Sequence, residues 1–224
     1  MQQRLVILKD GILMKYTCVI WDFNGTIFDD MNAGIVSVNK MLKERGLDII
    51  PSVEHYREIF DFPIKEYYRG LGFDFDREPY EVLAPIWVDL YNENAKNAGL
   101  CPSVAQTMKA LRDMNIKQVI ISACEINMLE YYLCKLDVRE YLDEVVGLDN
   151  IHAGGKIERG LEWRMRNPDE KAIMIGDTTH DAETANALNA DCVLYAKGHQ
   201  SRQRLEACGC PIVDDIADLI EFVK

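Results

Sequence analysis

Four short apolar runs recur along the 224-residue chain, and none of them shows the polar alternation of a half-exposed strand. Stretches with apolar residues at three- and four-residue spacing separate these runs. The runs cover 18–22, 118–122, 172–177 and 191–195, and a weaker one covers 144–147. Continuous apolar strands that alternate with amphipathic helices are typical of a parallel sheet buried on both faces. We therefore predict an α/β fold with a Rossmann-like, doubly wound parallel sheet, and helices over 103–115, 127–136 and 184–190.

The interval between the first two runs is far longer than the single helix that a right-handed crossover needs. Helical spacing recurs within it, with breaks at two prolines and at a Gly-Leu-Gly sequence. The helical stretches are 33–46, 53–60 and 80–99. We expect residues 31–100 to form an inserted helical domain, and residues 14–30 together with 101–224 to form the α/β core. Residues 1–13 are interpreted as an N-terminal leader outside this core.

Composition excludes several classes of protein. The chain has 37 acidic and 25 basic residues, so its net charge of -12 repels nucleic acid and anionic lipid over most of the surface. No apolar run reaches the length of a membrane span. Seven cysteines, an odd number without a CxxC pair, indicate reduced thiols and predict a cytoplasmic location. Because the net charge is negative, a ligand that carries phosphate would have to be bound by groups close to its own site.

Polar side chains close three of the apolar runs. Asp22, Ser122 and Asp177 are expected at the carboxyl ends of strands, where doubly wound sheets bind their ligands. Asp181 follows four residues after Asp177 at the start of a helix, where one acid alone would serve only as a cap. Together the three acids form an oxygen-rich set suited to Mg²⁺, and the Ser122 hydroxyl can donate to a phosphate oxygen. Lys156, in GGKIERG, is by itself an ordinary loop lysine.

These segments, in this order, resemble the motifs of the haloacid dehalogenase-like superfamily, most of whose members are Mg²⁺-dependent phosphatases. The resemblance implies that Asp22 is the nucleophile, that Ser122 and Lys156 bind the phosphate, and that an acidic pair holds the metal. That pair corresponds to Asp177 and Asp181. The insertion at 31–100 resembles the helical cap of phosphoglycolate phosphatase-like and β-phosphoglucomutase-like members. The expected substrate is a small phosphorylated metabolite.

A carboxylate that attacks a phosphate ester meets like-charge repulsion, so the site needs a bridging cation and donors for the phosphate oxygens. The expected phosphate-binding set is Ser122, Ala123, Lys156, Gly25 and Thr26. The expected metal ligands are Asp22, Asn24 through its main-chain carbonyl, Asp177 and Asp181. Glycine at position 25 would allow a close approach of the backbone.

Asn24 departs from the family pattern Asp-x-Asp, in which the second Asp exchanges protons with the leaving group and the attacking water. A carboxamide has no proton to exchange, and losing such help typically slows a reaction by about 10²- to 10⁴-fold. Two histidines, His180 and His199, are candidate replacements, although a solvent-facing position is expected for His180. The sequence therefore supports either a slowed phosphatase or an impaired homologue that binds phosphate as a sensor or partner protein.

Substrate choice is expected to lie in the insertion. The segment 60–69 offers Lys65 and Arg69 to meet a second anionic group, unless its aromatic residues form the core of the insertion and its cations face solvent. Three other functions fit less well. Signalling receiver domains are about half this length. Metal-free dehalogenases do not need both Asp177 and Asp181. Phosphomutases rely more heavily than phosphatases on the second Asp of the Asp-x-Asp pattern. A monomer or homodimer is expected, with no nucleic-acid or membrane partner.

Overall fold

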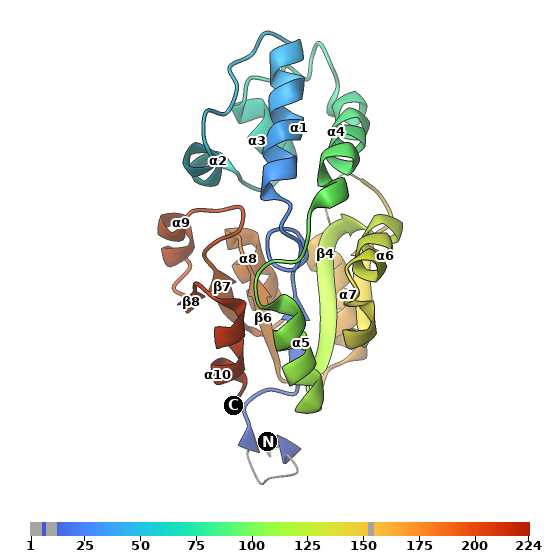
Figure 1. The fold of residues 1–224 in the computed structure, drawn as a ribbon, viewed down its shortest axis with the longest axis vertical. Helices are drawn as coiled ribbons and strands as arrows, with labels where there is room; N and C mark the ends of the chain where they lie inside the picture. The colour runs from blue at the N-terminus through green and yellow to red at the C-terminus, as the bar shows by residue number, and fades with distance from the viewer. Residues whose placement is uncertain (1–5, 8–12, 152–154) are drawn as a thin grey trace.

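The computed structural model describes residues 6–7, 13–151 and 155–224, and it contains a parallel sheet with helices on both faces (Figure 1). The strand order is β5–β4–β3–β6–β7–β8, and every neighbouring pair is parallel. The strands are β3 (Cys18–Trp21), β4 (Lys117–Glu125), β5 (Glu144–Leu148), β6 (Ala172–Gly176), β7 (Asp191–Tyr195) and β8 (Ile212–Val213). The predicted fold class is confirmed.

Strand β3 lies at the centre of the sheet, and the chain extends the sheet on one side of it before crossing to the other. Trp21, its last residue, lies in register with Ile120 of β4 and Ile175 of β6. The residues that follow β3 and β6 therefore emerge side by side at the carboxyl edge. This is the switch point at which open α/β sheets bind ligands.

Alternate residues of β3 pack on opposite faces of the sheet, because successive side chains of a strand point in opposite directions. Val19 and Trp21 belong to the cluster that includes residues of α5 (Val104–Asp113), α6 (Ile126–Lys135) and α10 (Leu219–Val223). Cys18 and Ile20 belong to the cluster with α7 (Lys156–Arg166) and α8 (Thr179–Ala187). Both faces are thus covered, which explains why the strands read as unbroken apolar runs.

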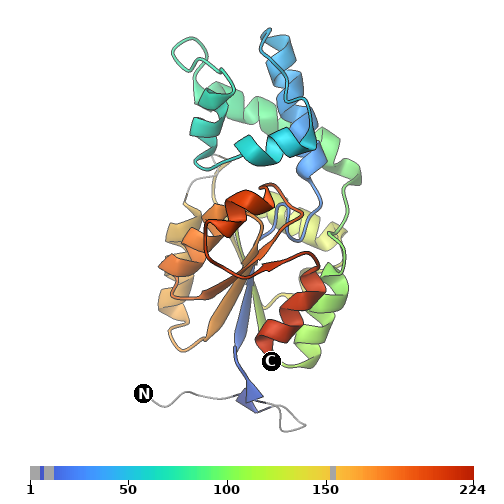
Figure 2. The ribbon, with the colours of Figure 1, turned by 90° about the vertical axis from the view of Figure 1, so that its left-hand side faces the viewer.

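Residues 31–100 form a separate group of helices at the carboxyl end of the sheet (Figures 1 and 2). They comprise α1 (Met31–Glu44), α2 (Val53–Ile59), α3 (Ile64–Gly70), α4 (Tyr80–Asn94) and the short η1 (Ala95–Asn97). These helices have their own buried apolar cluster, which includes Met41, Leu42 and Leu83. The chain enters and leaves this helical insertion at adjacent points, because the Asp29 amide donates to the Gly99 carbonyl at 3.0 Å.

The helical insertion rests on the core through α2 and the segment after it. Arg57 donates to the Gly198 carbonyl at 2.9 Å, and its own carbonyl accepts from the Ser201 amide at 3.1 Å. The Gln200 side chain donates to the Phe60 carbonyl at 3.0 Å. Both views place α2 directly above α9 (Arg202–Glu206) of the core (Figures 1 and 2). These hydrogen bonds to main-chain atoms hold the insertion in place over the carboxyl end of the sheet.

The structure confirms the five predicted strands and the helices predicted over 103–115 and 127–136, whereas the helix predicted over 184–190 is α8, which begins at Thr179 and ends at Ala187. The elements β8, α9 and α10 were not predicted, and three further places differ from prediction. The breaks at Pro63 and at Gly70-Leu71-Gly72 do mark helix ends, but between them lies α3, which was not predicted, with Pro63 at its N-cap and Gly70 as its last residue. Lys156 begins α7 and does not lie in a loop. Ser122 does not end its strand, because β4 continues to Glu125 past a register shift after Ile121.

The remaining described elements are short. They are β1 (Val6–Ile7) paired with β2 (Leu13–Met14), η2 (Arg139–Tyr141) and η3 (Ile216–Asp218). The rest of the predicted leader, 1–5 and 8–12, lies outside the described residues. All seven cysteines are free thiols, as predicted. Among the helices that the structure describes, none has the length and apolar character needed to cross a membrane.

Candidate active site

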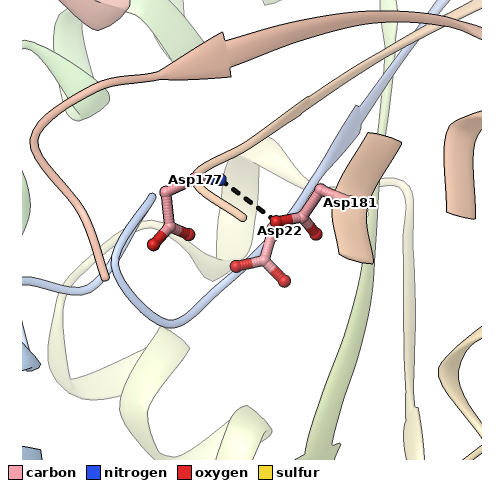
Figure 3. Close-up of side chains that lie close together, drawn as sticks. All are labelled: Asp22, Asp177 and Asp181. Carbon is pink, nitrogen blue, oxygen red and sulfur yellow. Dashed lines mark hydrogen bonds between the residues drawn. The ribbon is translucent and has the colours of Figure 1, made fainter. Parts of the chain in front are cut away.

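Three aspartates meet at the carboxyl edge of the sheet (Figure 3). Asp22 follows β3, Asp177 follows β6, and Asp181 lies in the first turn of α8. Each offers a carboxylate oxygen, and these three oxygens all lie within 4.8 Å of one another. All three side chains are buried, with Asp22 the most accessible at 6% exposure. The sequence prediction that these acids converge is therefore correct in its geometry.

Lys156 supplies the positive charge nearest to this acidic cluster. Its ammonium group donates to Asp22 Oδ1 and to Asp181 Oδ1, each at 2.5 Å. Lys156 is 3% exposed, and Gly155 before it adopts a φ of 97°, which favours glycine. Burial alone would lower the pKa of Lys156, but Asp181 and Asp22 hold it above its ordinary value. The lysine is therefore fixed as an ammonium ion between two of the three acids.

Asp181 holds the loop that carries Asp177. Its Oδ2 accepts from the Asp177 amide at 3.1 Å and from the Thr178 amide at 2.9 Å, and the Thr178 hydroxyl donates to the same oxygen at 2.7 Å. This is a capping box at the start of α8. Figure 3 shows the bond from the Asp177 amide as a dashed line. The four-residue spacing between Asp177 and Asp181 thus has a structural purpose in addition to any chemical one.

Asp177 is held by two donors from other segments. The Thr26 hydroxyl donates to its Oδ1 at 2.9 Å, and the His199 amide donates to its Oδ2 at 2.6 Å. Neighbouring glycines make room for it, since a Cβ added at Gly25 or at Gly198 would lie only 2.3 or 2.2 Å from Asp177 Oδ2. Gly25 also has a φ of 74°, so both its conformation and its surroundings favour glycine.

The acidic cluster has more negative charge than its surroundings neutralise. Burial raises the pKa of Asp22 well above its usual range, against the pull of Lys156, and the two other acids raise it further. Burial and the nearby Asp181 likewise raise the pKa of Asp177 to about 6, although His199 opposes this shift. Burial also acts on Asp181, but Lys156 and the Thr178 hydrogen bonds keep its pKa below the ordinary value. One ammonium group among three carboxylates leaves a strong attraction for a further cation.

The residues present fit a divalent metal ion. Carboxylate oxygens are the hard ligands that Mg²⁺ prefers, and Mg²⁺ usually takes one or two carboxylates and leaves its other positions to water and phosphate. Of the three acids, Asp22 and Asp177 have raised pKa values, as expected for groups that lack a full counter-charge. Asp22, Asp177 and Asp181 are thus the residues that could hold the ion.

The Asn24 side chain makes hydrogen bonds to a second polar group beside the acidic cluster. Its amide nitrogen donates to Asp30 Oδ2 at 2.8 Å and to the Tyr91 hydroxyl at 2.9 Å. The Tyr91 hydroxyl also donates to Asp30 Oδ2, at 2.7 Å. Asp30 Oδ1 accepts from the Gly25 amide at 2.8 Å. An amide at position 24 is therefore matched to a carboxylate at position 30.

His199 completes this second group, which we call the Asp30 network (Asn24, Asp30, Tyr56, Tyr91 and His199). Its Nε2 lies 3.2 Å from Asp30 Oδ1, and its Nδ1 lies 2.7 Å from the Tyr56 hydroxyl. Burial would lower the pKa of His199, but Asp30 raises it to about 9. Burial would raise the pKa of Asp30, but His199, Tyr91 and Asn24 lower it. The pair is therefore a buried ion pair. The sequence analysis considered His199 but missed Asp30 and both tyrosines.

A cavity lies between the acidic cluster and the helical insertion. Its lining includes Asp22, Asn24, Asp181 and Lys156 at the core end, and also Ser122 and Ala123 of β4. His180 lines it as well and stacks on Phe62 with ring centroids 4.8 Å apart, so it does not simply face solvent as expected. The structure thus brings most of the predicted site residues to one cavity.

Five of the predicted residues do not line this cavity: Gly25, Thr26, Asp177, Lys65 and Arg69. Asp177 lies behind it, in contact with Thr26 and the His199 amide. The Gly25 amide donates to the Phe28 carbonyl at 2.9 Å, and the Thr26 amide donates to the Phe23 carbonyl at 3.3 Å, so both amides are used inside their own turn. Lys65 pairs with Glu81 at 3.7 Å, and Arg69 pairs with Glu66. Both cations therefore lie on the polar surface of the insertion, which was the alternative interpretation.

A buried acidic cluster at the switch point of a parallel sheet, below an inserted group of helices, is the arrangement of an α/β enzyme that acts on a small charged molecule. The sequence comparisons specify the class. Residues 19–195 match the family of haloacid dehalogenase-like hydrolases, and the chain belongs to this family, as predicted.

Individual relatives are distant but cover most of the chain. A phosphoglycolate phosphatase of Photobacterium profundum is 23% identical over 217 residues, which cover 92% of this chain and 95% of that protein. A protein of Caldanaerobacter subterraneus that is named as a pyrophosphatase is 23% identical over 186 residues, covering 80% of this chain and 81% of its own length. A haloacid dehalogenase-like hydrolase of Streptococcus pneumoniae has the same fold, with a TM-score of 0.80 at 17% identity over 93% of this chain and 99% of that one.

Proposed function

We propose that the protein is a Mg²⁺-dependent phosphatase that hydrolyses a small phosphorylated metabolite through an aspartyl-phosphate at Asp22. One observation carries this proposal. Asp22 faces the cavity, Lys156 holds its Oδ1 at 2.5 Å, and two further acids converge on the same point. The family of the chain and the phosphatases among its relatives support the same reaction.

The reaction has two steps, each of which balances. In the first, a carboxylate oxygen of Asp22 forms a bond to phosphorus, and the bond from phosphorus to the ester oxygen breaks, so the alcohol leaves with the electron pair of that bond. In the second, a water oxygen forms a bond to phosphorus and the bond to Asp22 breaks, which releases inorganic phosphate. The proton balance is closed by the water, which gives one proton to the alcohol.

Lys156 and β4 would bind the phosphoryl group during both steps. The ammonium group of Lys156 is close enough to Asp22 to neutralise a phosphoryl oxygen as charge develops on it. Ser122 accepts from the Cys124 amide at 3.0 Å, which leaves its hydroxyl proton to donate toward the cavity that it lines. Ala123 would contribute its main-chain amide. Gly25 and Thr26 would act indirectly, by positioning Asp177.

Asp22, Asp177, Asp181 and the main-chain carbonyl of Asn24 are the proposed metal ligands. When bound, Mg²⁺ would supply positive charge that screens the repulsion between the Asp22 carboxylate and the phosphate. The carboxylates of Asp22 and Asp177 bind it only when deprotonated. Because burial raises the pKa values of both groups, protons compete with the metal at mildly acidic pH.

The side chain of Asn24 has no proton to give, and its amide is already bound to Asp30. The leaving alcohol would therefore take its proton from water, which makes the enzyme slow toward poor leaving groups. This same observation supports a second candidate, an impaired homologue that binds phosphate as a sensor or partner protein.

The helical insertion would act as a cap that excludes water and selects the leaving group, because it forms the upper wall of the cavity. We propose residues 31–100 as this cap domain and residues 14–30 with 101–224 as the catalytic core. A cytoplasmic location and a monomer or homodimer complete the proposal.

The test is phosphate release from a panel of phosphate esters by the wild type and by an Asp22→Asn variant, with Mg²⁺ and with EDTA. We expect release to require Mg²⁺, and the variant to lose at least about 10³-fold in rate, since it lacks the nucleophile. Thermal melting of both proteins controls for folding. Wild-type rates no higher than those of Asp22→Asn, together with Mg²⁺-dependent binding of inorganic phosphate, would instead establish the sensor.

A further inference from the structure

The leaving-group end of the cavity is unusually aromatic. Eight aromatic side chains from the helical insertion line it: Tyr56, Phe60, Phe62, Tyr67, Tyr68, Tyr80, Trp87 and Tyr91. Several are stacked, such as Trp87 on Tyr91 with ring centroids 4.7 Å apart, so their positions are fixed. The aliphatic Ile64, Ala84 and Val88 fill the remaining wall. A surface of this kind binds a neutral apolar group.

The part of the lining that the helical insertion contributes offers no cation to bind a second anionic group of the substrate. Among the described residues, Lys156 is the only lysine or arginine in the lining, and it already carries two ion pairs with Asp22 and Asp181. Arg57 is turned to the carbonyls of Lys197 and Gly198.

The two histidines of the lining are also engaged. His199 is paired with Asp30, and His180 lies 3.2 Å from Glu183. Glu125 adds another negative charge to the lining. A carboxylate or a second phosphate on the leaving group would therefore be buried without a partner, which is costly.

The size of the whole cavity, which includes the core end where the phosphoryl group would lie, limits the leaving group to no more than about one ring. It encloses about 140 Å³, close to the roughly 150 Å³ of an engineered apolar cavity in another protein that takes up benzene. One polar atom in the lining is unused, because the Tyr67 hydroxyl is buried and has no hydrogen-bond partner among the described residues. A polar substituent on the ring would satisfy it.

Asn24, at the core end of the cavity, also favours an aromatic leaving group. An alkoxide leaving group needs a proton as it departs, whereas a phenoxide is stable enough to leave with little help. A site that lacks the usual acid, and whose upper wall is aromatic, is suited to an aromatic ester. The two features lie on different segments, since Asn24 belongs to the core and the aromatic wall belongs to the insertion.

We propose that the substrate is an aryl phosphate monoester, with one phosphoryl group on a neutral single-ring phenol. This inference rests on the proposed phosphatase function and specifies its substrate class. It separates this chain from relatives that are named for phosphoglycolate or pyrophosphate, both of which carry a second anionic group.

The first test compares four substrates with Mg²⁺ present: phenyl phosphate, cyclohexyl phosphate, phosphoglycolate and pyrophosphate. We expect kcat/KM for phenyl phosphate to exceed those of the two doubly anionic compounds by at least about tenfold, because the cavity buries no counter-charge for them. Cyclohexyl phosphate should show a similar KM but a lower kcat, since its ring fits and its leaving group is poor. Equal or better use of phosphoglycolate or pyrophosphate, or equal kcat for the cyclohexyl ester, would overturn the proposal.

A binding measurement separates failure of this proposal from failure of the phosphatase function. Phenylphosphonate and phosphonoacetate cannot be hydrolysed as esters, and calorimetry with Mg²⁺ gives their affinities whether or not the protein turns over any ester. We expect phenylphosphonate to bind at least about tenfold more tightly. Equal affinities, or tighter binding of phosphonoacetate, would refute the aryl class even in an active phosphatase.

A variant pair tests the missing cation directly. Val88 lies on α4, is half-buried and lines the cavity, so Val88→Arg places a guanidinium there, and Val88→Met adds length without charge. We expect Val88→Arg to shift the affinity ratio toward phosphonoacetate by about tenfold or more. Val88→Met should leave the ratio near that of the wild type. An equal shift in both variants would show that size, and not charge, controls the choice of ligand.

Discussion

Two buried acidic centres lie next to each other in this molecule, and they differ in how well their charges are balanced. The acidic cluster of Asp22, Asp177 and Asp181 has three carboxylates and one ammonium group, from Lys156. The Asp30 network has one carboxylate, whose two oxygens meet an imidazole, an amide nitrogen of the main chain, a carboxamide and a phenol. The pKa values follow this difference, since that of Asp30 is lowered whereas those of Asp22 and Asp177 are raised.

The comparison indicates which centre binds ligands. A buried carboxylate with all its partners gains nothing from a further cation, so the Asp30 network is suited to holding the insertion on the core through Tyr56 and Tyr91. A cluster with excess negative charge is stabilised by whatever cation enters it, which suits a site that must bind metal. Both centres line the cavity, but only the acidic cluster has uncompensated negative charge there.

The largest expected effect on stability comes from removing the one ammonium group of the acidic cluster. Lys156→Gln leaves Asp22 and Asp181 buried without their counter-charge, so the free energy of unfolding should fall by about 3–5 kcal/mol at pH 7. The loss should shrink at pH 5, because burial already raises the pKa of Asp22 in the folded state, and a protonated Asp22 needs no counter-charge. Urea denaturation in EDTA at the two pH values measures both effects.

Lys117 provides the matched control for this variant. It pairs with Glu144 at 2.7 Å, but its side chain is 24% exposed and water screens the pair. Lys117→Gln should therefore cost no more than about 1 kcal/mol. Similar losses in the two variants would mean that Lys156 contributes no more than an ordinary surface lysine.

A slightly smaller effect is expected from the Asp30 network, and it depends on pH. The pKa of His199 rises from 6.5 to about 9 on folding, against burial and because of Asp30, and a shift of this size corresponds to about 3 kcal/mol. Because the folded pKa is the higher one, this stability is fully present below pH 6.5 and is lost as the pH rises through about 9. Besides Asp30, the charged and titratable groups around His199 are Asp177, Asp22 and Tyr56.

The measurement compares the wild type with His199→Gln in EDTA between pH 6 and pH 9.5. His199 also lowers the pKa of Asp177, which titrates near pH 6, so the part of the difference that changes above about pH 7 reports the histidine. That difference should be about 3 kcal/mol at pH 6 and should approach a small constant at pH 9.5. A difference that does not change with pH would show that His199 is neutral in the folded protein.

The sequence predicted the acidic cluster because its signals are local. Asp22 and Asp177 each follow an apolar run, and the edge at which parallel strands end is fixed by the fold. Asp181 followed from its spacing to Asp177 within one turn of helix. No contact between distant segments had to be known to place these three side chains.

The Asp30 network could not be predicted in this way, because its partners come from distant parts of the chain. Tyr91 is 61 residues from Asp30, and His199 is 169 residues from it. An aspartate just before a helix also reads as an ordinary cap, although Asp30 makes no side-chain cap hydrogen bond. The orientations of the Lys65 and Arg69 side chains could not be predicted from the sequence either, because they depend on Glu81 and on the aromatic residues of the insertion.

Asn24 joins the two centres, so it offers the sharpest way to tell them apart. In Asn24→Asp a carboxylate would replace the amide that now donates to Asp30 Oδ2 at 2.8 Å. Two carboxylates at this distance cannot both ionise easily, so the pair would retain a proton near neutral pH. That proton is what an alkoxide leaving group requires, and a general acid typically contributes at least about 10²-fold.

We therefore expect Asn24→Asp to raise kcat for cyclohexyl phosphate by about 10²-fold and kcat for phenyl phosphate by much less, because a phenoxide needs little protonation. Asn24→Ala is the control, since it removes the same amide donor from Asp30 but supplies no proton, and it should raise neither rate. Asn24→Ala should also lose some stability, because it leaves Asp30 with one hydrogen bond fewer, whereas the shared proton in Asn24→Asp replaces that bond. Equal gains on the two esters would mean that position 24 acts on the charge balance of Asp22 and not on the leaving group.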